Sequence, residues 1–380
     1  MKRVLIFSLA YYPHVGGAEV ALKEITDRIR DVEFHVVTMR FSPAEAREEK
    51  IGNMFVHRVE GSTSYLSKIL FVPRAAAAAA RLSRAQPFDA FWAMMSYMLF
   101  PIVLLRWSGA RVPYLLTLQE GDPWKHMFHR WFILPFRPLL ATGFRNASAI
   151  QTISTYLAGW AKHMGYCGEP QVIPNGVDVA RFEHVQHPVL HTTATLVTTS
   201  RLVHKNALDD VIRALVLLPV SVRFRIYGIG PEESRLRRLA EDIGVASRVD
   251  WKGHIDHTEL PLALAECDIF IRPSRSEGMG ISFIEAMAAG LPVIATQEGG
   301  IADFLYDSKR NPDKETTGWA VDKDSPEQIA EAVKDILAHP DEVARVVATA
   351  KKMVVEKYDW NLIAAQMKKV FDRVLDAPAG

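Results

Sequence analysis

The sequence predicts an α/β protein made of two doubly wound domains, each with a parallel sheet of the Rossmann type. The chain has 380 residues, which is too long for one ordinary hydrophobic core, so two domains are expected. Short apolar runs alternate with amphipathic helical stretches, as strands alternate with covering helices in parallel sheets. This alternation runs through the first half of the chain and restarts near residue 194, which indicates two such domains.

The strands of the first half are predicted at residues 4–9, 34–38, 88–94, 114–118, 149–153 and 171–173. Residues 1–10 run directly into Tyr-Tyr-Pro after a short apolar part, so a buried first strand is preferred to a leader peptide. The apolar run 90–105 is too short to span a bilayer and contains Pro101, which favours a strand followed by a core helix.

The second half is predicted to have strands at 194–200, 223–227, 249–251, 269–272 and 293–296, and helices at 209–217, 233–243, 258–265 and 326–338. Its last segment, 358–375, carries one apolar helical stripe. The stripe consists of Trp360, Ile363, Met367, Val370 and Val374. We expect this helix to pack on a domain surface and to cross back to the first domain.

The predicted domains are residues 1–184 and 185–357, with 358–380 packing back on the first domain. The linker is placed at 182–193, which lacks apolar periodicity. It contains three histidines, His184, His187 and His191. These have no acidic or cysteine partner nearby in the sequence, so no metal site is predicted there.

Composition is that of an ordinary globular protein, with two cysteines far apart, Cys167 and Cys267. They form no disulfide framework, so a reducing, cytoplasmic compartment is expected. Residues 1–184 hold 21 basic and 15 acidic side chains, whereas 185–380 hold 24 and 29. This asymmetry suggests an anionic partner for the first half, although chance surface composition explains it equally well. No nucleic-acid partner is expected.

The segment 276–296 combines a glycine-rich loop, a helix start and two glutamates, Glu277 and Glu285. A helix stop and a buried strand follow. Backbone amides at a helix N-terminus suit a phosphate, and carboxylates suit sugar or ribose hydroxyls, so the segment favours a nucleotide-sugar. Each glutamate has a simpler interpretation. Ser282 and Glu285 also fit a capping box, and Glu277 could be a solvent-facing loop charge.

Two further loops follow predicted strands, which is where a doubly wound sheet binds its ligands. Gly16 and Gly17 allow the backbone to approach a ligand closely, although a structural turn is the alternative. Arg201 and Lys205 can hold a diphosphate and stabilise its charge as it leaves. Their alternative interpretation is a solvated charged loop.

These motifs occur together and in a fixed order. They are Gly16-Gly17-x-Glu19, Ile173-Pro-Asn-Gly-Val-Asp178, Ser200-Arg-Leu-Val-His-Lys205, Gly228-x-Gly-Pro231 and Pro273-Ser-Arg-Ser-Glu277-x7-Glu285. The series resembles the GT-B glycosyltransferases of the group 1 type, also called family GT4. The resemblance runs from residue 2 to about residue 375, and the Glu-x7-Glu block is its most specific part. It implies two Rossmann-like domains that face each other across a cleft.

The resemblance also implies an activity, namely that of a retaining, metal-independent hexosyltransferase with a nucleotide-sugar donor and no cofactor. The implied catalytic residues are Arg201 and Lys205, on the diphosphate leaving group, and Glu277, on hydroxyls of the donor sugar. The other implied donor-binding residues are Glu285, on the ribose, and the backbone amides at Gly16, Gly17, Gly280, Ile281 and Ser282. The Asp322-Lys-Asp324 sequence is interpreted as a helix cap rather than as a metal site.

Two positions depart from the family pattern. Many relatives place a histidine near the reacting sugar after the strand 114–118, but this chain has Gln119-Glu120-Gly121-Asp122. Gln119 cannot act as a base. Glu120 or Asp122 could orient an acceptor hydroxyl, although Asp122-Pro123 is equally a turn. Asn206 replaces a glycine that often follows the lysine, and we expect little change because Asn tolerates left-handed geometry.

Residues 124–145 mix aromatic side chains with cations, as surfaces that lie on anionic lipid headgroups do. We expect a glycan or lipid-linked acceptor, met at the inner face of the plasma membrane in polysaccharide or cell-envelope biosynthesis. Ordinary helices that bury Trp131 and Phe132 would give the same pattern.

Two other functions fit the sequence less well. One is a catalytically silent nucleotide-sugar-binding scaffold, and the intact Arg201, Lys205, Glu277 and Glu285 argue against it. The other is a sugar phosphorylase or an epimerase of the same architecture. A phosphorylase needs a site for free phosphate, and no additional basic cluster indicates one.

Overall fold

The computed structural model describes residues 1–183 and 194–377, and the chain divides into two compact units. The first unit is Met1–Asn175 with Trp360–Gly380, and the second is Gly176–Asp359. The boundary predicted at residue 184 differs from this division because the chain joins the second unit directly after Asn175. There the Val177 amide donates to the Tyr358 carbonyl at 2.7 Å. The three histidines of the predicted linker lie outside the described residues.

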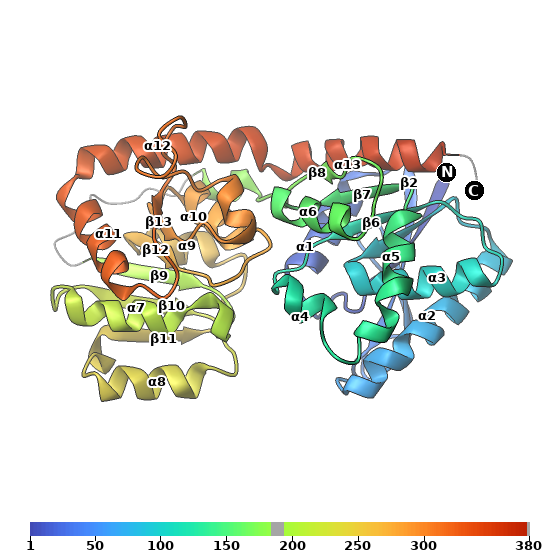
Figure 1. The fold of residues 1–380 in the computed structure, drawn as a ribbon, viewed down its shortest axis with the longest axis horizontal. Coiled ribbons are helices and arrows are strands. Elements are labelled where there is room, and N and C mark those ends of the chain that lie inside the picture. The colour runs from blue at the N-terminus through green and yellow to red at the C-terminus, as the bar shows by residue number, and fades with distance from the viewer. Residues whose placement is uncertain (184–193, 378–380) are drawn as a thin grey trace. The chain divides into compact units, whose positions relative to one another are not determined.

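The first unit is built on an eight-stranded sheet in the order β3-β4-β2-β1-β5-β6-β7-β8 (Figure 1). Its strands are β1 (Lys2–Phe7), β2 (Val32–Arg40), β3 (Glu48–Ile51), β4 (Met54–Glu60), β5 (Ala90–Met94), β6 (Tyr114–Leu118), β7 (Ala149–Thr152) and β8 (Gln171–Val172). Neighbours pair in parallel, except that β3 and β4 form an antiparallel hairpin. This hairpin was not predicted from the sequence, because its polar edge strand lacks an apolar run.

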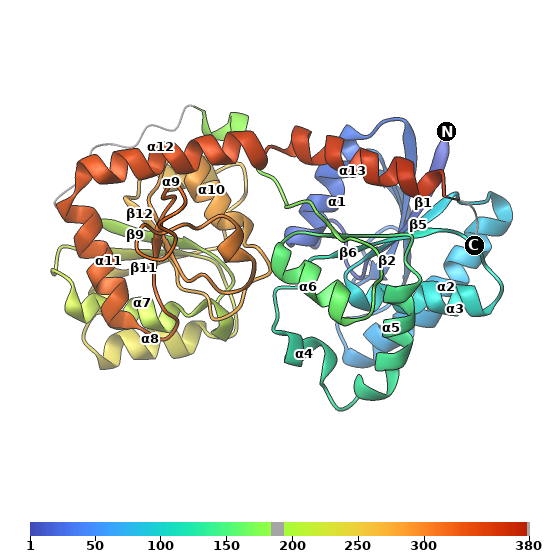
Figure 2. The same ribbon diagram turned by 45° about the horizontal axis from the view of Figure 1, so that its top comes forward.

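Helices cover both faces of this sheet (Figure 2). They are α1 (Gly17–Arg28), α2 (Tyr65–Ala85), α3 (Leu99–Trp107), α4 (Trp124–Phe128), α5 (Arg137–Arg145), α6 (Thr155–His163) and α13 (Trp360–Leu375). The helices α2, α3 and α5 pack together, whereas α13 packs against α1. All five residues of the predicted stripe on α13 are buried, and the Phe371 ring lies 5.0 Å from the Trp92 ring. The last helix therefore belongs to the first unit, as expected.

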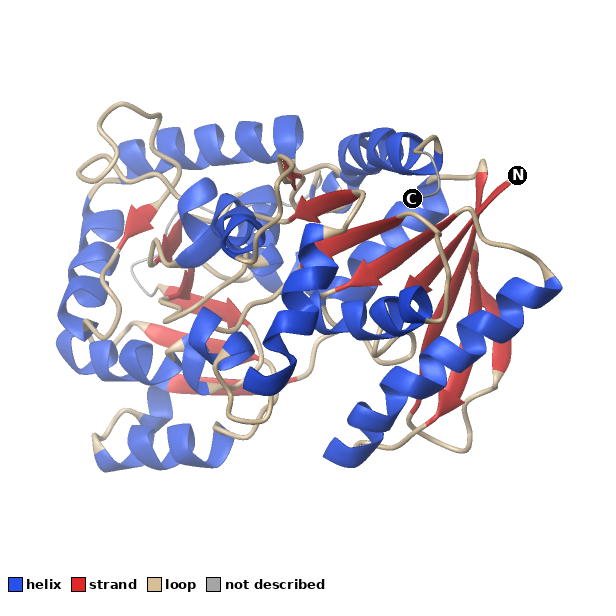
Figure 3. Cartoon of the chain, turned by 45° about the vertical axis from the view of Figure 1, so that its right-hand side comes forward, coloured by secondary structure: helices blue, strands red, loops and turns tan. Residues whose placement is uncertain are grey.

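The second unit is built on a six-stranded parallel sheet in the order β11-β10-β9-β12-β13-β14. Its strands are β9 (Thr195–Thr199), β10 (Arg223–Tyr227), β11 (Val249–Gly253), β12 (Ile269–Arg272), β13 (Val293–Ala295) and β14 (Trp319–Ala320). Its helices are α7 (Leu208–Ala214), α8 (Glu233–Asp242), α9 (Leu260–Ala265), α10 (Ile281–Ala289), α11 (Pro326–Ala338) and α12 (Pro340–Lys357). The group α7, α8 and α11 packs together, as does the group α9, α10 and α12, so helices again cover both faces (Figure 3).

Both sheets are wound in two directions from a central strand, which confirms the predicted fold class. In the first sheet β1 lies between β2 and β5, and in the second β9 lies between β10 and β12. The loops after β1 and β5 are therefore neighbours at the carboxyl edge of one sheet, and the loops after β9 and β12 are neighbours at that edge of the other. Doubly wound sheets bind their ligands at such switch points.

Candidate active site

The loop after β9 carries Arg201 and Lys205, and the neighbouring loop after β10 supports it. The amides of Ser200 and Leu202 donate to the carbonyls of Tyr227 and Ile229, both at 3.0 Å. A Cβ atom on Gly228 would lie 1.8 Å from the Ser200 carbonyl oxygen, so no larger residue fits there. The Gly228-x-Gly230 motif thus has a packing role: it lets the two loops approach closely.

Arg201 itself is exposed, and its carbonyl accepts a hydrogen bond of 2.7 Å from the side chain of Asn206. The left-handed residue of this loop is Ala207, with φ 54°, and not Asn206. Asn206 was expected to change the loop little because Asn tolerates left-handed geometry, but that reason does not apply here, since Asn206 is not left-handed. Its amide side chain is buried and holds the backbone at Arg201 instead.

The loop after β12 carries Glu277, whose carboxylate is held on both oxygens. Arg272 Nη2 donates to Oε2 at 2.9 Å, and the Gly278 amide donates to Oε1 at 2.9 Å. The Glu277 side chain is 14% exposed, so it is not the freely solvated loop charge of the simpler interpretation. Arg272 is buried, and burial lowers its pKa although the charges of Glu277 and Glu285 oppose that effect.

The helix α10 starts next to this loop, with Gly280 as its N-cap at φ 85°. A Cβ atom on Gly280 would lie 2.6 Å from Arg272 Nη2, so glycine is needed here both for its conformation and for space. Ser282 accepts a hydrogen bond of 2.8 Å from Arg272 Nη1, and Glu285 lies 3.3 Å from His257 Nδ1. The capping-box interpretation of Ser282 and Glu285 is therefore wrong.

The first amides of α10, at Ile281 and Ser282, lie at its N-terminus, where a helix leaves N–H groups without an intrahelical partner. Glu285 is buried one turn further along the same helix. An anion placed at this N-terminus would therefore meet N–H donors directly.

The two loops of the second unit are joined to each other. The amide of Arg275 donates to the carbonyl of Lys205 at 2.7 Å, so the Lys205 loop lies against the segment that leads to Glu277. The structure thus brings Arg201, Lys205, Glu277 and the N-terminus of α10 to one sheet edge. Three side chains around these residues were not predicted from the sequence, namely Arg272, Arg275 and His257.

In the first unit, α1 begins at Gly17 after the loop that follows β1. The amide of Gly16 donates to the side chain of Glu19 at 2.8 Å, which closes this helix start. Beyond its chain neighbours and its own helix backbone, a Cβ atom on Gly17 would meet no atom of the described residues within 4 Å, and both glycines are exposed. The space above Gly17 is therefore open to a ligand, as its predicted donor-binding position requires.

The residues after β6 differ in exposure: Glu120 is buried, whereas Gln119 and Asp122 are partly exposed. Gln119 and Asn175 exchange two amide hydrogen bonds, of 3.1 and 3.0 Å, so Gln119 is fixed by the Ile173–Asp178 motif. Glu120 is only 1% exposed and accepts a hydrogen bond of 2.6 Å from the Ser96 amide. Asp122 is partly exposed and lies 3.9 Å from His126 Nε2. Asp122 can therefore contact an acceptor directly, whereas the carboxyl group of Glu120 is enclosed and cannot.

Glu120 lies beside a strained segment at the end of β5. Met95 has φ 72° and ψ 157°, a combination that non-glycine residues rarely adopt. Burial raises the pKa of Glu120, although the Ser96 hydrogen bonds oppose this shift. Such strain next to a buried carboxyl group is typical of functional sites.

The Asp322-Lys-Asp324 sequence was predicted to cap a helix. It precedes α11, but neither aspartate caps that helix. Asp322 pairs with Arg310 at 2.9 Å and accepts a hydrogen bond from Gln328. Asp324 pairs with Arg275 at 2.5 Å. Within residues 1–183 and 194–377, no group of three His, Cys, Asp or Glu side chains is arranged to hold a metal ion.

Part of the segment 124–145 forms an exposed apolar surface on the first unit. Trp131 is 82% exposed, and Leu134 and Phe136 are also exposed, so the interpretation that the segment buries Trp131 is wrong. Tyr65 at the start of α2 packs against Phe132 with ring centroids 5.5 Å apart. The exposed Leu66 and Ile69 lie on the same helix turns. No helix within the described ranges is long and apolar enough to cross a membrane.

Comparisons with known proteins agree with this geometry. The family described as Glycosyltransferase Family 4 matches residues 15–181, and the family described as Glycosyl transferases group 1 matches residues 180–353. A GDP-mannose-dependent alpha-(1-6)-phosphatidylinositol monomannoside mannosyltransferase of Mycobacterium tuberculosis is 31% identical over 261 residues, which is 62% of this chain and 65% of the relative. The Mycolicibacterium smegmatis protein of the same name is 27% identical over 97% of both chains.

Solved structures share the fold. Sucrose-phosphate synthase from Thermosynechococcus elongatus has a TM-score of 0.84 at 17% identity, with 98% of this chain and 99% of that chain covered. Anabaena HepE, solved in complex with UDP and glucose, has a TM-score of 0.78 at 18% identity, with 98% and 100% covered.

Proposed function

Because the chain belongs to the group 1 glycosyltransferases, also called family GT4, we propose that it transfers a hexose from a nucleotide-sugar to a glycan or lipid-linked acceptor. One observation carries the proposal: the 2.7 Å hydrogen bond from Arg275 to Lys205 keeps the loop of Arg201 and Lys205 against the segment that leads to Glu277. Two cations and a fixed carboxylate at one sheet edge suit a diphosphate and the hydroxyls of a sugar.

The proposed reaction retains the anomeric configuration. The acceptor oxygen attacks the anomeric carbon on the face from which the diphosphate departs. The bond from that carbon to the diphosphate oxygen breaks, a bond to the acceptor oxygen forms, and the acceptor proton passes to the leaving phosphate. Arg201 and Lys205 stabilise the charge that develops on the diphosphate, while Glu277 orients the sugar through its hydroxyls.

Charge neutralisation in this proposal comes from the protein itself, without a metal ion or cofactor. Arg201, Lys205 and the N-terminal amides of α10 supply the positive charge and donors that a leaving diphosphate needs. Both carboxylates of the Asp322-Lys-Asp324 sequence already pair with arginines. Glu285 would accept hydrogen bonds from the ribose, with His257 beside it.

Relatives named for GDP-mannose make this sugar nucleotide the first donor to test. We propose a thermal-unfolding panel with GDP-mannose, UDP-glucose and ADP-glucose, followed by detection of transfer from the donor that binds. Ligand binding to the native state raises its apparent stability by an amount that grows with concentration. A shift with one base but not the others supports the donor-site assignment. No shift with any of the three at millimolar concentration contradicts it.

The acceptor is proposed to lie at an anionic membrane surface on its cytoplasmic side. Exposed Trp131, Leu134 and Phe136 are close in sequence to Arg130 and Arg137, which are partly exposed, so apolar and cationic groups both reach solvent in this segment. Such a surface inserts aromatic rings at the headgroup level while its cations meet lipid phosphates. A lipid-linked acceptor would then reach the first unit without leaving the membrane.

A further inference from the structure

Arg275 lies between the two loops that carry the candidate site of the second unit. It stands two residues before Glu277 in the chain. Its backbone amide donates to the Lys205 carbonyl at 2.7 Å, and its Nη1 donates to the His204 carbonyl at 2.9 Å. A single residue thus binds the Lys205 loop twice while its own chain continues into Glu277.

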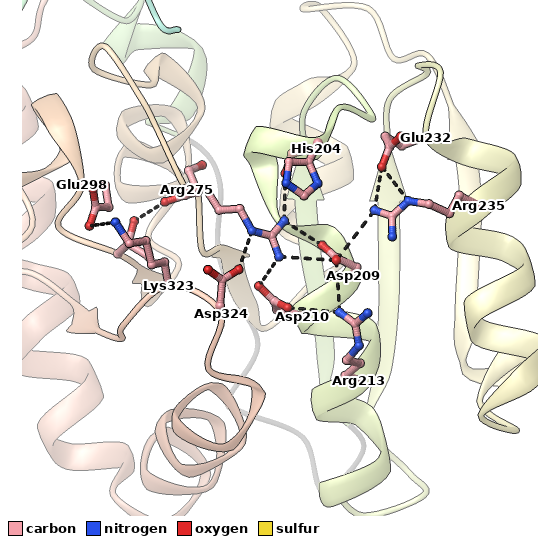
Figure 4. Close-up of polar contacts among 12 residues, drawn as sticks. His204, Asp209, Asp210, Arg213, Glu232, Arg235, Arg275, Glu298, Lys323 and Asp324 are labelled. Carbon is pink, nitrogen blue, oxygen red and sulfur yellow. Dashed lines mark hydrogen bonds and ion pairs between the residues drawn. The ribbon is translucent and has the colours of Figure 1, made fainter. Parts of the chain in front are cut away.

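The guanidinium of Arg275 is itself fixed on all three nitrogens (Figure 4). Nε donates to Asp324 at 2.5 Å, Nη1 to Asp209 at 3.0 Å and Nη2 to Asp210 at 2.9 Å. The two neighbouring aspartates form the first turn of α7, the helix that follows the Lys205 loop. The side chain of Arg275 is only 16% exposed, and those of Asp209 and Asp210 are 7% and 4% exposed, so its bonds to these two aspartates form largely away from water, whereas Asp324 is 60% exposed. Charge-assisted bonds of this kind hold a side chain in one geometry.

The charges in this cluster support the same arrangement. Burial acts against the ionised form of Asp209, but hydrogen bonds from Arg275 and Arg213 more than offset it, and the pKa of Asp209 is lowered. Burial likewise opposes the charge of Arg275, yet its bonds to Asp209 and Asp324 raise its pKa overall. Arg275 therefore stays charged over the whole working pH range.

We propose that Arg275 is a positioning residue that sets the separation between Lys205 and Glu277. This rests on the proposed function, in which Lys205 meets the diphosphate and Glu277 meets the sugar of one donor. The span between those two parts of a nucleotide-sugar is fixed by its covalent structure. A shift of about 1 Å in a reacting geometry costs on the order of 10²-fold in rate, so the loop contacts of Arg275 matter to the reaction without touching the donor.

Arg213 provides a matched control for this proposal. It pairs with the same two aspartates, at 3.1 Å from Asp209 and 3.2 Å from Asp210, but it lies on α7 rather than between the loops. Arg275→Gln and Arg213→Gln therefore each remove one cation from the same aspartate pair. Only the first also removes a side-chain bond to the Lys205 loop.

The test measures kcat, donor KM and unfolding midpoint for the full-length wild type, Arg275→Gln, Arg275→Lys and Arg213→Gln. We expect Arg275→Gln to lower kcat by on the order of 10²-fold, with donor KM changed less, while Arg213→Gln stays within about threefold of wild type. Both Arg275→Lys and Arg275→Gln keep the backbone bond to Lys205, but only Arg275→Lys keeps the charge, and we expect it to recover about tenfold over Arg275→Gln. This conservative variant also separates loop geometry from a general loss of folding.

A double variant tests whether Arg275 acts through Lys205. If it does, adding Arg275→Gln to Lys205→Ala lowers kcat by no more than about threefold further, because the positioned group is already gone. Fully additive losses, or a kcat for Arg275→Gln equal to that of Arg213→Gln, overturn the inference alone. A wild type that neither binds nor transfers any sugar nucleotide overturns the proposed function and this inference with it.

Discussion

Arg272 and Glu277 form an ion pair of 2.9 Å between Nη2 and Oε2, with both side chains largely withdrawn from water. The same guanidinium donates to Ser282, and its carbon lies 4.2 Å from the centre of the Phe283 ring. One buried arginine thus connects the Glu277 loop to the first turn of α10. The direction of the Glu277 carboxylate is set before a ligand arrives, as a preorganised site requires.

Replacing Arg272 by methionine should destabilise the protein strongly. It leaves Glu277 without its cation in a largely buried position, and breaking a buried pair in this way costs about 3–5 kcal/mol. Urea unfolding measures the change. Arg225→Met is the comparison, because Arg225 lies on β10 of the same sheet, separated from β12 by β9, and pairs with the exposed Glu266, a contact worth about 0–1 kcal/mol. Equal losses for the two variants would contradict the larger cost expected for breaking the buried pair of Arg272 and Glu277.

Lys205→Ala and Glu277→Ala should each lower kcat by on the order of 10²-fold or more, because each removes charge or orientation at the proposed donor site. Steady-state kinetics with the donor identified by the binding panel provides the measurement. Thermal unfolding of both variants establishes that they remain folded at the assay temperature. Near wild-type transfer by both folded variants would refute the roles assigned to them.

Glu120→Gln should become more stable relative to wild type as the pH rises. Burial raises the pKa of Glu120 in the folded state above its ordinary value of 4.5, so the folded protein holds this proton more tightly than the unfolded chain. Between about pH 4.5 and the raised pKa, the wild type therefore loses stability with increasing pH. The glutamine does not titrate, and its oxygen can still accept the hydrogen bond from Ser96.

Urea-unfolding midpoints of the wild type and Glu120→Gln between pH 4.5 and pH 8 measure this difference. Glu241→Gln, which changes an exposed glutamate of α8, serves as the comparison. If the difference between wild type and Glu120→Gln is constant over that range, the buried carboxyl group does not exchange its proton as inferred.

Strands that are buried on both faces were predictable, because their sequences are continuous apolar runs. β6 and β12 have the predicted bounds for this reason. The hairpin of β3 and β4 was not predictable from the sequence, because β3 is a short polar edge strand, Glu-Glu-Lys-Ile, that resembles a loop. The segment 182–193 lay at the predicted domain boundary, but the structure assigns residues 176–183 to the second unit through contacts that are distant in sequence.

The candidate site was predictable in its loops but not in the side chains that support them. Strand order alone places the loops of Lys205 and Glu277 side by side. Arg272 ends an otherwise apolar strand, Ile-Phe-Ile-Arg, and a charge there requires a buried partner, which is the signal that could have identified it. Arg275 gives no such signal, because its partners Asp209 and Asp324 are 66 and 49 residues away.

Trp131→Glu should weaken binding to anionic vesicles by roughly tenfold or more, because it removes a large exposed aromatic group from the proposed membrane surface. Sedimentation with phosphatidylglycerol-containing and neutral vesicles, at low and high salt, measures the effect. Trp107→Glu is the matched control, since Trp107 is 70% exposed at the far end of α3 and lies outside the segment 124–145. Its binding should stay near that of wild type.

The salt dependence separates the two contributions to this binding. High salt screens the attraction of Arg130 and Arg137 to lipid phosphates but leaves the transfer of Trp131 into the headgroup region largely unchanged. Wild-type binding should therefore fall with salt, and Trp131→Glu should bind more weakly than Trp107→Glu at each salt concentration. If the wild type does not sediment with anionic vesicles even at low salt, the proposal that the segment 124–145 binds a membrane surface is refuted.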